Sequence, residues 1–142
     1  MTSSPIELTV PATLPAVRLL AAAFRGLLHD WKVPEERAAT LELALVEAAT
    51  NVVRHAYRDR TPGRVRVRAV REGRNLAVSV IDTGNSFDPS KVPPPPVPDP
   101  EDPSTWPEGG MGLSIMRAAC HRLDYVSEGE ENALTMVVHD LF

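Results

Sequence analysis

Glu47, Asn51 and His55 stand at successive intervals of four residues and could do chemistry together. This spacing fits one side of a helix, which has about 3.6 residues per turn. The amide oxygen of Asn51 suits Mg²⁺, and a carboxylate such as Glu47 can take a proton from a hydroxyl or a water. His55 could support phosphates or Glu47, or serve as a structural histidine at a helix end. An ordinary solvated helix face would carry the same residue types, so this motif decides nothing alone.

A second candidate lies at the end of a predicted strand. Alternating apolar residues predict a half-buried strand over 75–82. The strand ends at Asp82, and Gly84 follows it. A carboxylate before a glycine that permits a sharp turn can accept a hydrogen bond from the amino group of adenine. An ordinary strand-ending turn uses the same residues.

A third candidate is the glycine segment that precedes a predicted helix, Gly109-Gly110-Met111-Gly112-Leu113. Glycines there allow close backbone approach and leave N–H groups at the positive end of the helix dipole, which suits phosphate. No Lys-Ser or Lys-Thr follows, so this is not the GxxxxGK[ST] loop. No strand precedes it, so it does not open a dinucleotide-binding unit. A flexible hinge is the alternative.

In this order the three motifs resemble the ATP-binding domain of the Bergerat (GHKL) family. That family includes histidine kinases, gyrase-type ATPases, Hsp90-type chaperones and anti-sigma-factor kinases. The tract from Glu47 to Tyr57 is most similar to stand-alone anti-sigma-factor serine/threonine kinases of the RsbW type. The resemblance, from about Ile6 to the C-terminus, implies ATP and Mg²⁺ as cofactors, Glu47 as catalytic base and Asn51 as metal ligand. The cofactor contacts that it implies are Asn51, Asp82, Gly84, Gly110, Met111, Gly112, Leu113 and Thr135.

Two departures from the family pattern are visible. A further glycine often found after Gly84 is missing, and the segment 85–89 instead ends in Phe-Asp-Pro, as in many stand-alone members. The frequent Gly-Thr near the C-terminus is here Leu134-Thr135. Thr135 keeps a hydroxyl that we expect to reach the base, while the loss of glycine alters the backbone path.

The resemblance implies a protein serine/threonine kinase that regulates a sigma factor by partner switching. Such a kinase phosphorylates a small anti-anti-sigma antagonist protein and binds the sigma factor when the antagonist is phosphorylated. A non-catalytic ATP-dependent anti-sigma or signalling module is one alternative. A histidine-kinase-type ATPase domain is another, disfavoured because we expect no transducer or phosphoacceptor helix in this chain.

Composition predicts a single cytoplasmic domain over residues 1–142. A formal charge of −4 and a pI near 5.5 argue against a nucleic-acid surface. Arg64, Arg66 and Arg68 alternate with valines, which indicates the solvated face of a strand. The single cysteine, Cys120, excludes an internal disulfide and is expected in the core. We find no signal segment and no apolar run of membrane-spanning length. A homodimer is left open.

Hydrophobic periodicity predicts elements in the order β-α-α-β-β-α-β-β. This order predicts an α+β two-layer sandwich, with a mixed, mostly antiparallel sheet and helices on one face. The expected strands cover about 6–10, 64–71, 75–82, 124–128 and 133–140, and the expected helices about 13–31, 33–57 and 112–122.

A proline-rich segment separates the adenine-type motif from the glycine segment. Residues 85–108 hold nine of the fourteen prolines, which forbid a helix or a central strand there. The Bergerat fold carries its ATP lid at this place, so we interpret the segment as a lid that closes on nucleotide. A disordered spacer and a PxxP ligand for another domain are the alternatives.

Overall fold

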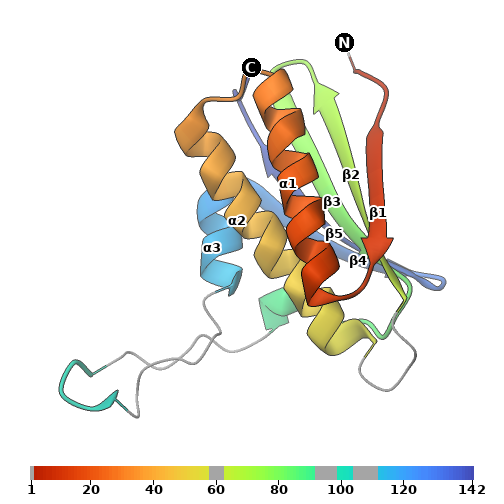
Figure 1. Ribbon diagram of the computed structural model, residues 1–142, viewed down its shortest axis with the longest axis vertical. Coiled ribbons are helices and arrows are strands. Elements are labelled where there is room, and N and C mark those ends of the chain that lie inside the picture. The colour runs from red at the N-terminus through yellow and green to blue at the C-terminus, as the bar shows by residue number, and fades with distance from the viewer. Residues whose placement is uncertain (1, 58–62, 92–98, 104–111) are drawn as a thin grey trace.

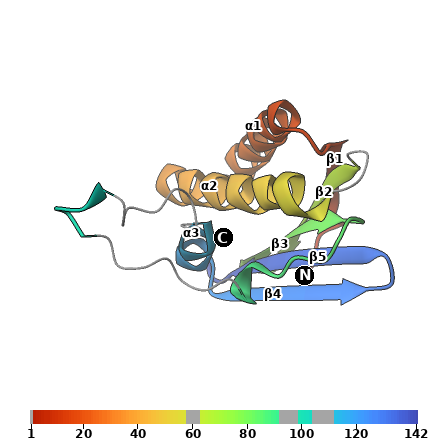
Figure 2. The same cartoon turned by 90° about the horizontal axis from the view of Figure 1, so that it is seen from below.

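In the part of the chain that the structure describes, five strands form one antiparallel sheet, and three α-helices cover one of its faces (Figures 1 and 2). The computed structural model describes residues 2–57, 63–91, 99–103 and 112–142. Within these ranges the sheet order is β1-β2-β3-β5-β4, and each neighbouring pair is antiparallel. The strands are β1 (Ile6–Pro11), β2 (Arg64–Glu72), β3 (Asn75–Asp82), β4 (Arg122–Glu128) and β5 (Glu131–Val138). The α-helices are α1 (Leu14–Asp30), α2 (Glu35–Asn51) and α3 (Gly112–Ala119).

The predicted α+β two-layer class and element order are confirmed, with shifts in detail. The helix expected over 33–57 is α2 followed by a π-helical turn, η1 (Val52–Ala56). α3 ends before residue 122 because the His121 N–H donates to the Val137 carbonyl at 2.8 Å, where β4 starts to pair with β5. The last two strands begin at 122 and 131 rather than at 124 and 133. The sheet expected to be mixed is antiparallel at every pairing of the described strands.

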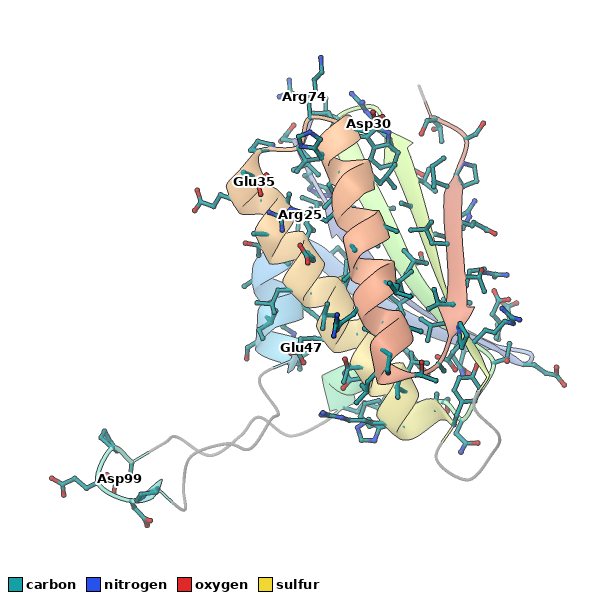
Figure 3. The ribbon with its side chains drawn as sticks, viewed as in Figure 1. Arg25, Asp30, Glu35, Glu47, Arg74 and Asp99 are labelled. Atoms are coloured by element: carbon teal, nitrogen blue, oxygen red, sulfur yellow. The ribbon has the colours of Figure 1, made fainter. Side chains whose placement is uncertain are left out.

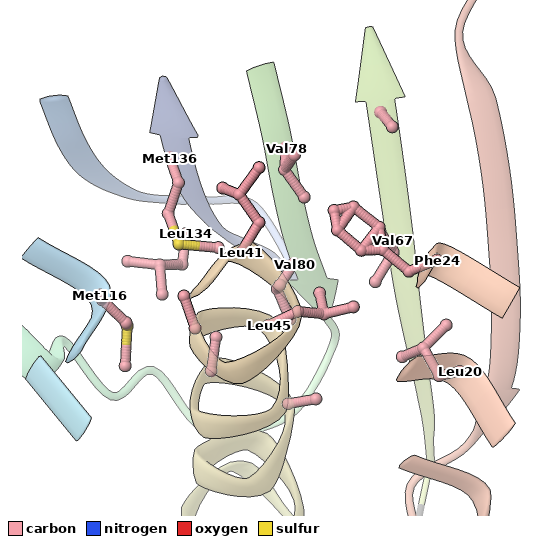
Figure 4. Close-up of a cluster of buried hydrophobic side chains, with 14 of the residues drawn as sticks. Leu20, Phe24, Leu41, Leu45, Val67, Val78, Val80, Met116, Leu134 and Met136 are labelled. Atoms are coloured by element: carbon pink, nitrogen blue, oxygen red, sulfur yellow. The ribbon is translucent and has the colours of Figure 1, made fainter. Parts of the chain in front are cut away.

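The hydrophobic core fills the space between the helices and the sheet (Figure 4). Strand alternation directs Val78, Val80, Leu134 and Met136 toward α2. The apolar stripe predicted along this helical tract is buried throughout, at Leu41, Leu45, Ala48, Val52 and Ala56. Each fully buried side chain of leucine size contributes roughly 1.5–3 kcal/mol. The packing therefore fixes the position of α2, which carries Glu47 and Asn51, over β3 and β5.

Two local interactions fix the helices. Thr13 caps α1, since its Oγ1 accepts from the Ala16 N–H at 3.3 Å. Arg25 on α1 forms ion pairs with Glu35 and Glu42 on α2 (Figure 3). These contacts join α1 to α2 at the solvent side of the helix layer.

The opposite face of the sheet carries the arginines of β2. Arg66 pairs with Glu131 at 3.2 Å, and Arg68 pairs with Glu7 at 3.7 Å. Surface pairs of this kind contribute about 1 kcal/mol or less. These side chains form the solvated strand face that the sequence indicates.

Cys120 lies directly after α3 and is half-buried, which partly meets the expectation of a core position. Its Sγ–H donates to the Met116 carbonyl at 3.1 Å. Burial raises the pKa of the thiol, so the neutral form is favoured and the residue packs rather than reacts.

Tyr57, buried at the end of η1, joins the helix layer to two strands. Its hydroxyl donates to the Arg64 carbonyl at 2.9 Å and accepts from the Thr83 N–H at 3.0 Å. Its ring packs on Gly63, where an added Cβ would lie 2.4 Å from ring atoms. The hydroxyl therefore ties the start of β2 to the turn that follows β3.

We expect Tyr57→Phe to lower the free energy of unfolding by about 1–3 kcal/mol, because the Arg64 carbonyl and the Thr83 N–H lose their partner. Urea denaturation followed by circular dichroism measures the effect. Thr40→Val is the control, because it removes an exposed hydroxyl that bonds the Glu36 carbonyl. The control should change stability by less than about 0.5 kcal/mol. Equal stability of Tyr57→Phe and wild type would contradict this role.

Candidate functional site

A small pocket lies between the α2–η1 junction and the sheet. Its walls are apolar apart from a few polar groups. The lining residues are Ala48, Asn51, Val52, Ala56, Val80, Asp82, Phe87, Pro89, Tyr125 and Leu134. An apolar slot with few polar groups suits a flat heterocycle that needs orientation.

Asp82 is the buried carboxylate of this pocket, with an exposed fraction of 7%. Its Oδ1 accepts from the Gly84 N–H and from Asn132 Nδ2, both at 2.9 Å. Burial raises the pKa of Asp82, and these hydrogen bonds partly oppose the increase. No other hydrogen bond to the carboxylate is formed within the described part of the chain, so Oδ2 is available to a ligand.

Asn132 is a second buried polar residue beside the pocket and was missed by the sequence reasoning. It lies directly opposite Asp82 in the pairing of β3 with β5, and its exposed fraction is 3%. A signal was present, because Asn132 shares the alternating phase of Leu134 and Met136. A polar residue in the buried phase of a strand requires a partner.

Gly84 is fixed by contact with η1. A Cβ at this position would lie 2.3 Å from the Ala56 carbonyl oxygen, and the Asn85 N–H donates to that same oxygen at 2.6 Å. π-helical turns are frequent at functional sites. Because η1 ends at Ala56, the Ala56 carbonyl has no partner within the helix, and the strand-end loop supplies one.

Phe87 and Tyr125 form one wall of the pocket. The Phe87 N–H donates to the Tyr125 hydroxyl at 2.8 Å. The Phe87 ring stacks on His55, with centroids 4.1 Å apart and an interplanar angle of 15°. Burial raises the pKa of Tyr125, so its hydroxyl stays neutral near pH 7. His55, expected near Glu47 or phosphates, thus packs against the segment that follows the Asp82 turn.

Glu47 and Asn51 approach the pocket from α2. Asn51 lines it, and Glu47 lies on the side of α2 that meets α3 (Figure 3). A Cβ at Gly112 would come within 2.8 Å of Glu47 Oε2, so the glycine keeps space for the carboxylate. The helical motif and the last glycine of the glycine segment therefore meet, as the sequence-based hypothesis requires.

The remaining site residues from the sequence are placed differently. Leu113 is half-buried in the first turn of α3 and does not line the pocket. Gly110 and Met111 lie outside the described residues. Thr135 faces the opposite side of the sheet, where its hydroxyl bonds Ser79 at 2.8 Å. The expectation that Thr135 reaches the base therefore does not fit this register, because alternation assigns that face to its neighbours.

The side-chain oxygen of Asn51 is a ligand that a magnesium site would use. It is half-buried, and its side-chain amide makes no hydrogen bond within the described part of the chain. In that part no group of three or more His, Cys, Asp or Glu side chains could hold a metal. Mg²⁺ commonly uses one or two protein oxygens together with waters and phosphates, so a single Asn51 oxygen fits it.

A family model described as the histidine kinase-like ATPase domain matches residues 10–138, and the chain belongs to this family. Serine/threonine-protein kinase BtrW from Bordetella bronchiseptica is 29% identical over 134 residues, covering 94% of this chain and 92% of BtrW. Serine-protein kinase RsbW from Oceanobacillus iheyensis is 31% identical over 115 residues, covering 80% of this chain and 73% of RsbW. The chain is thus homologous to serine kinases of the RsbW and BtrW type.

The fold is shared with the crystal structure of the RsbU and RsbW domains of Rv1364c from Mycobacterium tuberculosis. The TM-score is 0.68 at 22% identity, and the match covers 96% of this chain and 32% of that chain. Among the described helices, none has both the length and the apolar character needed to cross a bilayer.

We expect Asp82→Asn to raise the free energy of unfolding at pH 7. The raised pKa means that folding penalises the charged carboxylate above its folded-state pKa. The penalty disappears as the pH falls toward the ordinary value of 3.8, so the gain of the variant should shrink from pH 7 to pH 4. Urea denaturation at both pH values tests this. The prediction would be contradicted if the stability of the variant relative to wild type were lower at pH 7 than at pH 4.

We expect Gly84→Ala to lower the free energy of unfolding by about 1–3 kcal/mol, because the new Cβ meets the Ala56 backbone. Gly26→Ala in α1 is the matched control. Open space surrounds that position, and the change should stabilise the helix by about 0.5–1 kcal/mol. Thermal unfolding should show that Gly84→Ala destabilises the protein and Gly26→Ala stabilises it. Stabilisation by both changes would refute the close approach at Gly84.

Proposed function

We propose that this chain is an anti-sigma-factor protein serine/threonine kinase that binds Mg-ATP. The observation that carries the proposal is the buried Asp82 carboxylate, whose Oδ2 is available beside an apolar slot. A buried acceptor in that position selects a flat ring that carries an amino group, such as adenine. Membership of the histidine kinase-like ATPase family supports the same ligand.

The phosphate end of the ligand would lie toward α2 and α3. Asn51 would contribute one oxygen to Mg²⁺, which would neutralise phosphate charge when bound. The N-terminus of α3 at Gly112 presents backbone N–H groups at the positive end of its dipole. Gly110, Met111 and Leu113 stay predicted contacts of the same segment.

Glu47 would act as the general base. Its carboxylate makes no hydrogen bond or ion pair within the described part of the chain, and it lies next to Gly112. It would take the proton from the serine or threonine hydroxyl of the protein substrate. General bases of this kind typically contribute 10²–10⁴-fold to rate.

The protein substrate would be a small anti-anti-sigma antagonist, and the alternative partner a sigma factor. Homology to kinases named RsbW and BtrW supports this assignment. We also propose that the single domain 1–142 includes a lid over residues 85–108. Phe87 and Pro89 in its first part already line the pocket. Residues 92–98 and 104–111 lie outside the described ranges.

We expect Glu47→Gln to lower phosphotransfer by roughly 10²-fold or more while ATP affinity stays within a few-fold. The amide keeps the shape of the carboxylate but cannot take the proton. The assay combines the full chain, labelled ATP and an antagonist-like protein encoded beside it, with mass spectrometry of the modified hydroxyl. Calorimetry measures ATP affinity separately.

Glu36→Gln is the matched control, because Glu36 is an exposed carboxylate in the first turn of α2. It should leave phosphotransfer unchanged. Wild type that binds ATP but modifies no antagonist would favour the non-catalytic anti-sigma module. Unchanged transfer in Glu47→Gln would remove Glu47 from the mechanism.

A further inference from the structure

Asn132 uses its side chain to connect three groups at the base of the pocket. Its Nδ2 donates to Asp82 Oδ1 and to the Gly84 carbonyl, each at 2.9 Å. Its Oδ1 accepts from Ser127 Oγ on β4 at 2.7 Å. The opposite orientation of the amide would place its oxygen against a carboxylate and a carbonyl, so the network itself fixes the orientation.

This network restrains the Asp82 carboxylate. The carbon–carboxylate torsion of aspartate has a broad energy well, so an isolated carboxylate turns easily. Two donors on Oδ1, one from Gly84 and one from Asn132, hold that oxygen in place. Because the carboxylate is planar, fixing Oδ1 also fixes the direction of Oδ2.

We propose that Asn132 is a positioning residue that gives the pocket its preference for a 6-aminopurine over a 6-oxopurine, an inference that rests on the proposed nucleotide function. A fixed Oδ2 accepts from a 6-amino group. A 6-oxo group is itself an acceptor and meets the same oxygen with repulsion. Discrimination of this kind requires an acceptor that cannot turn away or exchange roles.

Ser127 supports Asn132 in this role. It lies on the edge strand β4, and its hydroxyl is the donor that the described structure gives to Asn132 Oδ1. Without it the amide can turn, and the Gly84 carbonyl and Asp82 then lose their shared donor. The hydrogen bonds that would determine selectivity for the base therefore extend from β3 through β5 to β4.

The test compares ATP with inosine triphosphate, which replaces the 6-amino group by a 6-oxo group. Calorimetry on the full chain should show that wild type prefers ATP. Leucine has a shape similar to that of asparagine but cannot form these hydrogen bonds. In Asn132→Leu we expect the ratio of ATP affinity to inosine triphosphate affinity to fall roughly ten- to a hundredfold, mainly through weaker ATP binding. In Ser127→Ala we expect a smaller fall in the same direction.

Thr135→Val is the matched control, since its hydroxyl bonds Ser79 on the other face of the same strand. It should leave the ratio unchanged. If Asn132→Leu does not fold, as judged by circular dichroism, Ser127→Ala decides. Equal weakening of both nucleotides would indicate a merely structural role and overturn the inference. If wild type prefers ATP and both variants keep the same ratio of ATP to inosine triphosphate affinity, the inference about Asn132 is wrong but the proposed function stands. If wild type binds neither nucleotide, the proposed function is wrong as well.

Discussion

The buried Asp82 carboxylate is the constraint on which the rest of the site depends. Burying a charge is costly unless hydrogen bonds compensate it, and here the Gly84 N–H and the Asn132 amide supply them. The raised pKa shows that compensation is incomplete. Stability is thus given up at a position where an available oxygen meets an apolar slot, as is common for binding sites. The turn at Gly84 and the position of Asn132 on β5 both serve to hydrogen-bond this one group.

The π-helical turn η1 connects this strand-end site to the helix layer. Burial of the α2 stripe fixes Glu47 and Asn51 above the sheet, while the Ala56 carbonyl at the end of η1 accepts a hydrogen bond from the loop after Asp82. Only a residue without a Cβ fits at Gly84 against that carbonyl. The helix motif and the strand-end motif, which are far apart in the sequence, are therefore held together by backbone contacts that do not depend on a ligand.

Local spacing was sufficient to predict the elements and their order, whereas the grouping of Glu47, Asn51, Asp82 and Gly84 into one site came from the resemblance to the family pattern. Long-range strand register was not available from the sequence. A shift of one residue exchanges the two faces of a strand. The pairing of Asp82 with Asn132 was therefore needed to recognise that Asn132, and not Thr135, lies on the pocket face of β5. The π turn was also missed, because its five residues continue the apolar stripe of a regular helix.

We propose a ligand site on the helix-covered face of the sheet, at the Asp82 end of β3. Amide NMR spectra of the isotope-labelled chain, recorded with and without Mg-ATP, test it most directly. The backbone amide of Gly84 and the side-chain amide of Asn132 should shift, while the backbone amides of Glu7 and Thr9 on the edge strand β1, which does not line the pocket, should not. Shifts confined to β1, or no shifts at saturating nucleotide, would contradict this assignment.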